Sequence, residues 1–447
     1  MILKNLEFVD ELDGELGALI HEITPHFEES LIRAFKNDTL SYHRQEKKQC
    51  FHTLDDVIHP IGETMIELRN LQLAWVPDFR INQLRAHLGM LCLDFQLNLG
   101  SLNVEGEYGA NNARLQEFLP VAHEGRATIT FNNMTAKGRV GLFINDDSLL
   151  PENNDTVYET REVDIRVRYQ TTNSRYMETK ISRNNVEETL GISMWSQLTQ
   201  ILTGLLSSQL KRVLSEFSLS DLFGDKMEHF RKREKELIHK SNRLADHLLC
   251  SAKDFIVHND FREVFTPNYD IIFRGKPTSI SLGNLRTSQG DLKDLSTLNR
   301  QKCWSCYAND KELIFFGFFS LKIFKHTYRV YEAEFESTKV SGSINMSVHR
   351  NGILFRVKFL RNDTTCEYVM EAVELQDVGD IDVDISGLAS LGWLHPRVVS
   401  WTIANFRHQG KRVLEKLIKE SFDYAIEEMN KANEYPDTVE KFDNKVT

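Results

Sequence analysis

Three short stretches of the chain carry residue types that could do chemistry. His21-Glu22-Ile23-Thr24-Pro25-His26 approaches the HExxH zinc motif but has one residue too many between its histidines. Asp380-Ile381-Asp382-Val383-Asp384 has the spacing of a calcium loop, yet Ile385 stands where that loop needs glycine and Leu391 where it needs glutamate. Cys303-Trp304-Ser305-Cys306 is a lone CxxC pair without a second pair for zinc. We therefore expect no metal site and no cofactor.

Other catalytic signatures are absent from the sequence. It contains no GxSxG, GxxxxGK[ST] or GxGxxG motif, so it offers no nucleophile elbow, phosphate loop or dinucleotide fold. An enzyme would need a cleft with perturbed histidines or carboxylates, and no candidate set is found. We predict a protein that is not an enzyme, in which Asp380–Asp384 forms a strand with acids outward and the cysteines are structural thiols or form one or two disulfides.

Charge and composition exclude several classes of partner. The chain has 447 residues and a net charge of 54 − 65 = −11. Residues 1–220 carry −10 (21 − 31) and the remainder −1 (33 − 34). An acidic chain argues against binding to nucleic acid or to an anionic membrane. No apolar run is long enough for a transmembrane segment. Acids near the start leave no signal peptide visible, so either the chain is cytosolic or the sequence is a mature or mis-started form.

Two charged segments are expected on the surface. Arg231–Glu236 alternates in sign at helical spacing, which predicts a solvated helix face; a contact with an acidic protein partner is the alternative. The acidic stretch Asn145–Glu162 is predicted to be an exposed loop, and it carries one of five N-x-[ST] sequons, a feature of secreted proteins. We expect the sequons at Asn133 and Asn345 to lie at related hairpin turns.

The most informative feature is a repeat at a spacing of 200 residues. Lys211-Arg212-Val213-Leu214 recurs as Lys411-Arg412-Val413-Leu414. Both copies lie in stretches whose apolar residues recur every three or four positions, which indicates amphipathic helices. Gly410 lies on the second apolar stripe, where a missing side chain permits close approach of a neighbour. Each copy of the repeat therefore contains one long helix at its end.

Strand patterns recur in the same order. Ile165–Tyr169 matches Phe355–Phe359 in its alternation of apolar and basic residues, and Phe131 is matched by Phe335. From Leu91 to Leu99 every second residue is apolar, as in a strand with one dry face, and the phase reverses after Gly100, which predicts a bulge there. Leu313–Phe324 is apolar on both faces, which predicts a strand buried on both sides or pressed against the other unit.

These patterns predict an α+β protein of two tandem units. Each unit is a long curved antiparallel sheet wrapped around long amphipathic helices, because the helical stripes are the apolar surfaces able to cover the dry sheet face. We place the first unit at residues 1–220 and the second at 221–447. The join near Ser218–Lys226 is short and polar, so we expect the units to pack together or stay close.

This arrangement resembles the tubular lipid-binding (TULIP) superfamily, in particular arthropod takeout proteins, juvenile-hormone-binding proteins and mite group 7 allergens. The segments that carry the resemblance are Asn70–Leu99, Val104-Glu105-Gly106-Glu107-Tyr108-Gly109 and the hairpin Gly125–Val140. The resemblance implies a tubular wrap around an apolar ligand and a secreted, extracellular location. A tandem pair of this length also resembles the bactericidal/permeability-increasing family, whose antibacterial members are strongly basic; the acidic charge of this chain disfavours endotoxin binding.

We therefore expect non-catalytic binding and transport of a hydrophobic small molecule, such as a lipid, fatty acid or terpenoid hormone, in apolar cavities. The alternative is a structural or protein-interaction module with filled cores and no ligand. The predicted ligand-lining residues lie on the dry faces of the strands and helices: Leu93, Phe95, Leu97, Ile129, Phe131, Ile165, Val167, Leu202, Leu206, Leu210, Phe319, Phe335, Phe355, Val357, Ile403 and Phe406.

Overall fold

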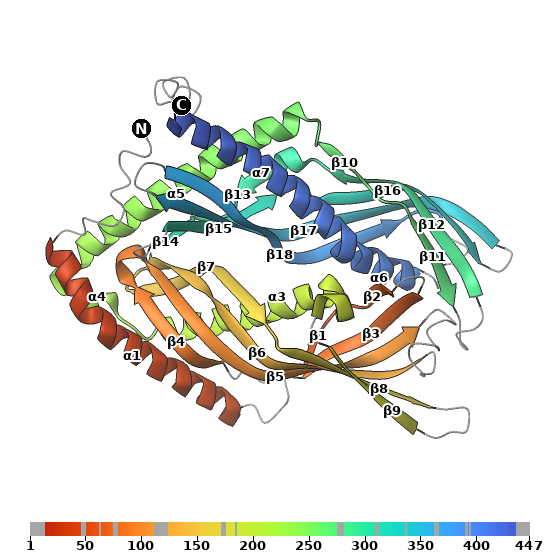
Figure 1. The fold of residues 1–447 in the computed structure, drawn as a ribbon, viewed down its shortest axis with the longest axis horizontal. Coiled ribbons are helices and arrows are strands. Elements are labelled where there is room, and N and C mark those ends of the chain that lie inside the picture. Colours follow the sequence, from red (N-terminus) through yellow and green to blue (C-terminus); the bar gives the residue numbers. More distant parts are fainter. Residues whose placement is uncertain are drawn as a thin grey trace.

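The fold was analysed in a computed structural model. It describes residues 14–434 apart from 46–50, 62–63, 75–78, 111–123, 171–175, 184–185, 275–280, 309–312, 336–337, 362–365, 389–391 and 393–394. Two antiparallel sheets lie one above the other in Figure 1, each with long helices along it. This is the predicted α+β architecture of two tandem units. No helix in the described ranges has the length and apolar character needed to cross a membrane.

The first sheet contains nine strands and is flanked by two long helices, α1 (Gly14–Gln45) and α3 (Val186–Leu214). Its path runs β1-β3-β5-β6-β8-β9, with β2, β4 and β7 paired to β3, β5 and β6 respectively. The strands are β1 (Phe51–Thr53), β2 (Val57–Ile61), β3 (Thr64–Ala74), β4 (Arg80–His87), β5 (Cys92–Ala110), β6 (Glu124–Asn145), β7 (Ser148–Glu159), β8 (Glu162–Gln170) and β9 (Tyr176–Arg183), with a 3-10 turn η2 (Leu88–Met90) after β4.

The second sheet also contains nine strands and begins after the short helices α4 (Leu219–Phe223) and η3 (Gly224–Lys226) and the long helix α5 (Met227–His258). A helical run of α6 (His395–Asn405), a π-helix η6 (Phe406–Gly410) and α7 (Lys411–Glu434) follows it. The strands are β10 (Glu263–Thr266), β11 (Tyr269–Arg274), β12 (Ser281–Lys293), β13 (Leu298–Arg300), β14 (Ser305–Ala308), β15 (Leu313–Leu321), β16 (Lys325–Phe335), β17 (Thr338–Arg361) and β18 (Cys366–Ile385), with a 3-10 turn η4 (Leu295–Thr297) before β13.

The two sheets share one scheme of strand pairing. The short strands β1 and β2 pair with β3, as β10 and β11 pair with β12. The long strand β5 corresponds to β15 and β16 together, β6 to β17, and β7 and β8 together to β18. The residue matches taken from the sequence alone were wrong in detail. Phe131 lies inside β6 whereas Phe335 ends β16, and Ile165–Tyr169 lies in β8 whereas Phe355–Phe359 lies in β17.

The alternation in β5 has the predicted consequence. Leu93, Phe95 and Leu97 are buried, and the buried phase changes to Leu102 and Val104 beyond the bulge. The pairing with β6 shifts on both sides of Gly100, whose positive φ of 72° suits glycine. The strand β15 is buried on both faces along most of its length, as its apolar composition predicted.

One segment differs sharply from the sequence prediction. Asn145–Glu162 is not an exposed loop; it contains the whole strand β7, in which Asn153, Asn154 and Asp155 are buried. Asn153 and Asp155 are paired with residues of the second unit, which the pattern of a single strand does not reveal. The sequons at Asn133 and Asn345 also lie within strands, β6 and β17, rather than at hairpin turns.

The units pack against each other, as the short join predicted. A small apolar cluster of Cys92, Tyr307, Ile314 and Phe316 joins β5 to β14 and β15. The Arg139 guanidinium lies 4.5 Å from the centre of the Tyr307 ring, a cation–π contact. The charged run at Arg231–Glu236 belongs partly to this interface.

Candidate ligand-binding cleft between the two units

The predicted lining residues lie together in the core. Fourteen of the sixteen belong to, or pack against, one hydrophobic cluster that extends through both units. Ile403 is only half-buried, and the side chain of Phe335 lies outside the described residues. Side chains such as Phe131 and Phe355 are fully buried and in contact with aromatic neighbours. Ligand contact at these sixteen positions remains a prediction.

A cleft of about 660 Å³ lies between the units. This volume is in the range of small-molecule sites. One side is formed by α3 and β7 of the first unit, and the other by β15, β17, β18 and α7 of the second. Aromatic side chains of both units line it, namely Tyr158, Trp195 and Phe318. The cleft therefore exists only when the two units are packed together.

Gly204 keeps part of the cleft open. It lies in the middle of α3, where glycine costs about 1 kcal/mol relative to alanine. A Cβ atom at this position would meet nothing within 4 Å, so the glycine is not required for close packing. Its backbone is also ordinary helix. The remaining effect of the glycine is to leave a space the size of a side chain facing the cleft.

Paired charges line the second-unit side of the cleft. Lys411 Nζ donates to Ser196 Oγ at 3.0 Å, across the units, and lies 3.7 Å from Glu415 Oε1. The Glu415 carboxylate also accepts the backbone N–H of Leu375 at 2.7 Å, and burial raises its pKa. Asp377 accepts from Gln200 Nε2 at 2.7 Å and lies 3.8 Å from Arg350. These contacts fix both walls of the cleft.

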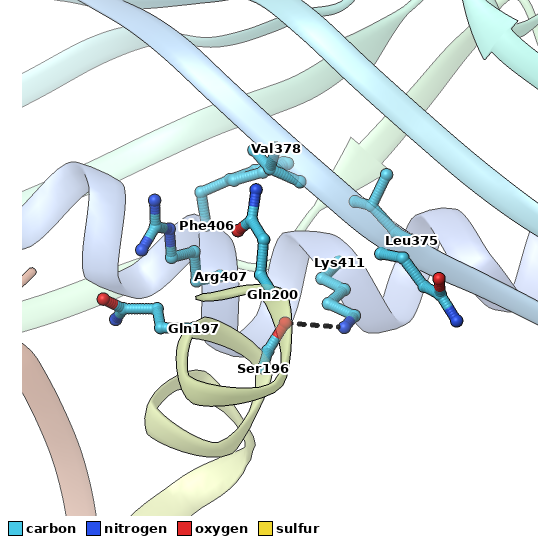
Figure 2. A pocket seen from close by; sticks show the side chains of 9 residues that line it. Ser196, Gln197, Gln200, Leu375, Val378, Phe406, Arg407 and Lys411 are labelled. Atoms are coloured by element: carbon cyan, nitrogen blue, oxygen red, sulfur yellow. Dashed lines mark hydrogen bonds between the residues drawn. The ribbon is translucent and has the colours of Figure 1, made fainter. Parts of the chain in front are cut away.

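Beside the cleft is a recess of about 10 Å³, with room for one water molecule. Figure 2 shows that Ser196, Gln197 and Gln200 approach it from α3, and Phe406, Arg407 and Lys411 from the π-helix and α7. The Phe406 side chain, at the start of the π-helix, lies in the core. A Cβ atom at Gly410 would lie 2.5 Å from the Phe406 ring, so the ring approaches this glycine closely, as predicted. Arg407 instead forms an ion pair with Asp55 of the first unit.

A second cavity of about 480 Å³ lies where α1, η2, α5 and β14 meet. His21, His87 and Arg233 line it together with apolar residues. Arg233 Nε donates to the Gly89 carbonyl at 3.1 Å, and the neighbouring Glu234 accepts the N–H of Ile144 at 2.5 Å. Arg231 also donates to the Asp146 carbonyl at 2.9 Å. Three residues of the charged run thus contact the first unit, whereas Lys232, Lys235 and Glu236 are exposed.

No group of three or more His, Cys, Asp or Glu side chains is arranged to hold a metal ion within the described ranges. The thiols of Cys92, Cys250, Cys303 and Cys306 are free. Burial raises the pKa of Cys306 to about 11 and also raises the pKa of Cys92, so neither thiol is activated as a nucleophile.

A sequence profile of the group 7 allergen family matches residues 241–424. The match begins in α5, spans the second sheet and ends in α7, so it covers the helix-wrapped second unit. The second unit is therefore similar to the group 7 allergen family. Both antiparallel sheets of the chain are flanked by long helices.

Solved structures give further points of comparison with this chain. Takeout 1 from Epiphyas postvittana is 14% identical over 48% of this chain and 85% of its own, with a TM-score of 0.21. Lipopolysaccharide binding protein is 9% identical over 86% of this chain and 90% of its own, with a TM-score of 0.18. Because both TM-scores are low, neither alignment supports a conclusion about this chain. No protein of curated function matches the sequence.

Sequence reasoning did not find the cleft of this protein. Trp195, Gly204 and Lys411 come together only because the two units pack, and they are separated by up to about 200 residues in the chain. One signal was present: Lys411 belongs to the repeated Lys-Arg-Val-Leu motif. The first copy, at Lys211, is exposed, whereas the Lys411 side chain is 14% exposed and contacts the other unit.

Proposed function

We propose that this protein binds and carries a hydrophobic small molecule without catalysis. The observation that carries the proposal is the cleft of about 660 Å³, lined by aromatic side chains of both units. A ligand held there would remove apolar surface from water, which stabilises a complex by about 25 cal/mol per Å². The group 7 allergen match and the helix-wrapped sheets support a binding role of this kind.

The proposed units are residues 1–220 and 221–447, derived from one ancestral unit by duplication. The common scheme of strand pairing supports this. Under this proposal the sixteen predicted lining positions form a second place where a ligand chain could enter. A lipid, a fatty acid or a terpenoid such as a juvenile hormone would all fit an apolar tube.

Native mass spectrometry of the freshly purified full chain tests the function. We expect a mass above that of the polypeptide, and a hydrophobic molecule recovered by solvent extraction. The delipidated protein should then bind a fluorescent fatty acid or monoacylglycerol with saturation at one or two molecules per chain. Absence of both a co-purified molecule and saturable binding overturns the proposal.

The alternative is a protein-interaction module with filled cores. The observation that favours it is the tight packing of two predicted lining residues, Phe319 and Phe355, with each other and with Phe422, at ring-centre distances of 4.4–5.3 Å. This alternative predicts that the protein is isolated without lipid and gains no stability from added amphiphiles. The same mass spectra and a thermal-shift measurement decide between the two.

We also propose that the protein is secreted, in line with the TULIP resemblance. Of the described sequon residues, Asn37, Asn133 and Asn345 are exposed, whereas Asn154 is buried. Expression in a secretory cell line followed by treatment with a peptide:N-glycosidase tests this. A shift in mobility that is lost in an Asn345→Gln or Asn133→Gln variant supports secretion, and retention of the chain in the cytosol contradicts it.

A further inference from the structure

Resting on the proposed binding function, we infer that the cleft between the units takes the head group of a neutral amphiphile, one with hydroxyl or amide groups rather than a carboxylate or phosphate. The inference names a chemical class for the ligand and places its polar end among α3, β18 and α7. It rests on the charges, the hydrogen-bonding groups and the open space around Gly204.

The charges of the cleft are already paired. Its two cations are Arg350, which lies 3.8 Å from Asp377 and 3.7 Å from Asp380, and Lys411, which lies 3.7 Å from Glu415. Glu374 adds a further carboxylate to the lining. An anionic head group would meet more carboxylates than cations and would have to displace an existing partner from a cation. Burial of a charge without a new partner is unfavourable, so the lining disfavours a carboxylate or phosphate.

The remaining polar groups suit a hydroxyl. Ser196 Oγ accepts a hydrogen bond from Lys411 and therefore keeps its own O–H to donate. Thr199 Oγ1, one turn along the same face of α3, donates to the Ser196 carbonyl and keeps lone pairs to accept. Thr203 Oγ1 lies 3.2 Å from the Tyr158 hydroxyl. A donor and acceptors in a row along one helix match a ligand hydroxyl, which needs both.

The apolar part of such a ligand has a surface to lie on. Trp195 and Phe318 line the cleft from opposite units, and Val157 of β7 is 44% exposed at its edge. Gly204 leaves the space between α3 and these side chains unfilled. A Cβ atom at this position would meet no atom within 4 Å, so a leucine side chain would extend into that space. Gly204→Leu is thus a variant that obstructs the cleft while leaving the two cores intact.

Two probes with the same acyl chain test the inference. Delipidated full chain is titrated at pH 7.5 with monooleoylglycerol and with oleate, and affinities are measured by displacement of a fluorescent lipid. We expect monooleoylglycerol to bind at least tenfold more tightly than oleate. Gly204→Leu should weaken monooleoylglycerol at least tenfold. Ser208→Leu, one turn further on α3 and outside the lining, is the matched control and should leave the affinity within twofold.

The outcomes separate the inference from the proposed function. If neither probe binds the wild-type chain, both are overturned. If both probes bind and Gly204→Leu changes nothing, the ligand lies elsewhere and only the cleft assignment is overturned. If oleate binds as tightly as monooleoylglycerol, the neutral class is wrong. Glu374→Gln removes one carboxylate from the lining and should raise the affinity for oleate severalfold. Circular dichroism of each variant checks that it is folded.

Discussion

Arg356 of β17 donates two hydrogen bonds to the carboxylate of Asp155 in β7, one of them at 2.8 Å from Nε. The Asp155 side chain is 2% exposed and that of Arg356 is 16% exposed, so the pair is buried between the units. Arg139 of β6 adds a third charge 3.9 Å from the same carboxylate. The geometry is that of a bidentate arginine–carboxylate pair, in which both charges keep their hydrogen-bonding partners after leaving water.

Removing one partner of this pair should destabilise the protein strongly. Asp155→Ala leaves Arg356 buried without its carboxylate, and we expect a loss of about 3–5 kcal/mol in the free energy of unfolding. Guanidinium chloride unfolding of the full chain measures it. Arg168→Ala, which breaks the exposed pair with Glu178, is the control and should cost at most about 1 kcal/mol. Equal losses in the two variants would contradict the argument.

Gly141 is a second point of contact between the units. A Cβ atom there would overlap Ser305 Oγ of β14, which in turn accepts a hydrogen bond from Asn153 at 2.8 Å. We expect Gly141→Ala to cost about 1–3 kcal/mol, the range for overpacking a close-packed site. Thermal unfolding measures it.

The partner substitution makes this prediction specific. Ser305→Gly removes the overlapping atoms, so the double variant Gly141→Ala with Ser305→Gly should lose less stability than the two single changes added together. Additive effects would mean that the alanine is accommodated in some other way. Gly204→Ala, at an open helical position, should instead leave stability unchanged or raise it.

His326 should make stability depend on pH. The ring is 2% exposed, Nε2 lies 3.0 Å from Thr266 Oγ1, and burial lowers its pKa from 6.5 to about 4. As the pH falls, His326 is therefore protonated near pH 6.5 in the unfolded chain but only near pH 4 in the native protein. The contribution of the neutral His326 to the free energy of unfolding is fully present above pH 6.5. It decreases as the pH falls from 6.5 towards 4, by about 2 kcal/mol between pH 7 and pH 4.5.

The His326→Gln variant isolates this effect. Urea unfolding at pH 7 and pH 4.5 should show a loss on acidification that is about 2 kcal/mol smaller than in the wild type, because the titrating group is gone. The carboxylates titrate alike in both proteins and cancel in the comparison. An unchanged difference between the two pH values would show that burial does not lower the pKa of His326 in the native protein.

Phe355 distinguishes a filled core from a ligand-lined tube. It is fully buried against Phe319 and Phe422, with ring centres 4.8 and 4.4 Å away. In a filled core, Phe355→Ala creates a cavity and should cost about 3–5 kcal/mol whether or not lipid is present. If the ring instead lines a ligand site, the cost should depend on added amphiphile. Chemical unfolding with and without monooleoylglycerol measures the difference.

The regular parts of the fold follow from local pattern. The alternation from Leu93 to Leu97 and the phase change at Gly100 predicted both the strand and its bulge, because burial of one sheet face leaves a period of two in the sequence. The helical stripe around Leu202 predicted α3 in the same way. Such signals depend on a residue and its near neighbours, which a single sequence contains.

The cleft and the interface depend on residues far apart. The acidic segment around Asp155 was predicted to be a surface loop because acids are usually solvated, and the charge that allows its burial is Arg356, 201 residues later. The unit-to-unit matches failed for a related reason: a bulge in β5 takes the place of the break between β15 and β16, so equivalent strands are not separated by one constant offset. Only the pairing of strands reveals which residues correspond.

The helix α5 gives the molecule a mechanical property. Its first turns are bonded to the first unit through Arg233 and Glu234, and near its end the ring of Phe255 lies 4.7 Å from that of Tyr424 on α7. With 32 residues it is about 48 Å long at 1.5 Å per residue. A tilt of about 5° at its start would move its far end by about 4 Å over that length. Any change in the angle between the units is thereby amplified into a displacement at the opposite end of the second sheet.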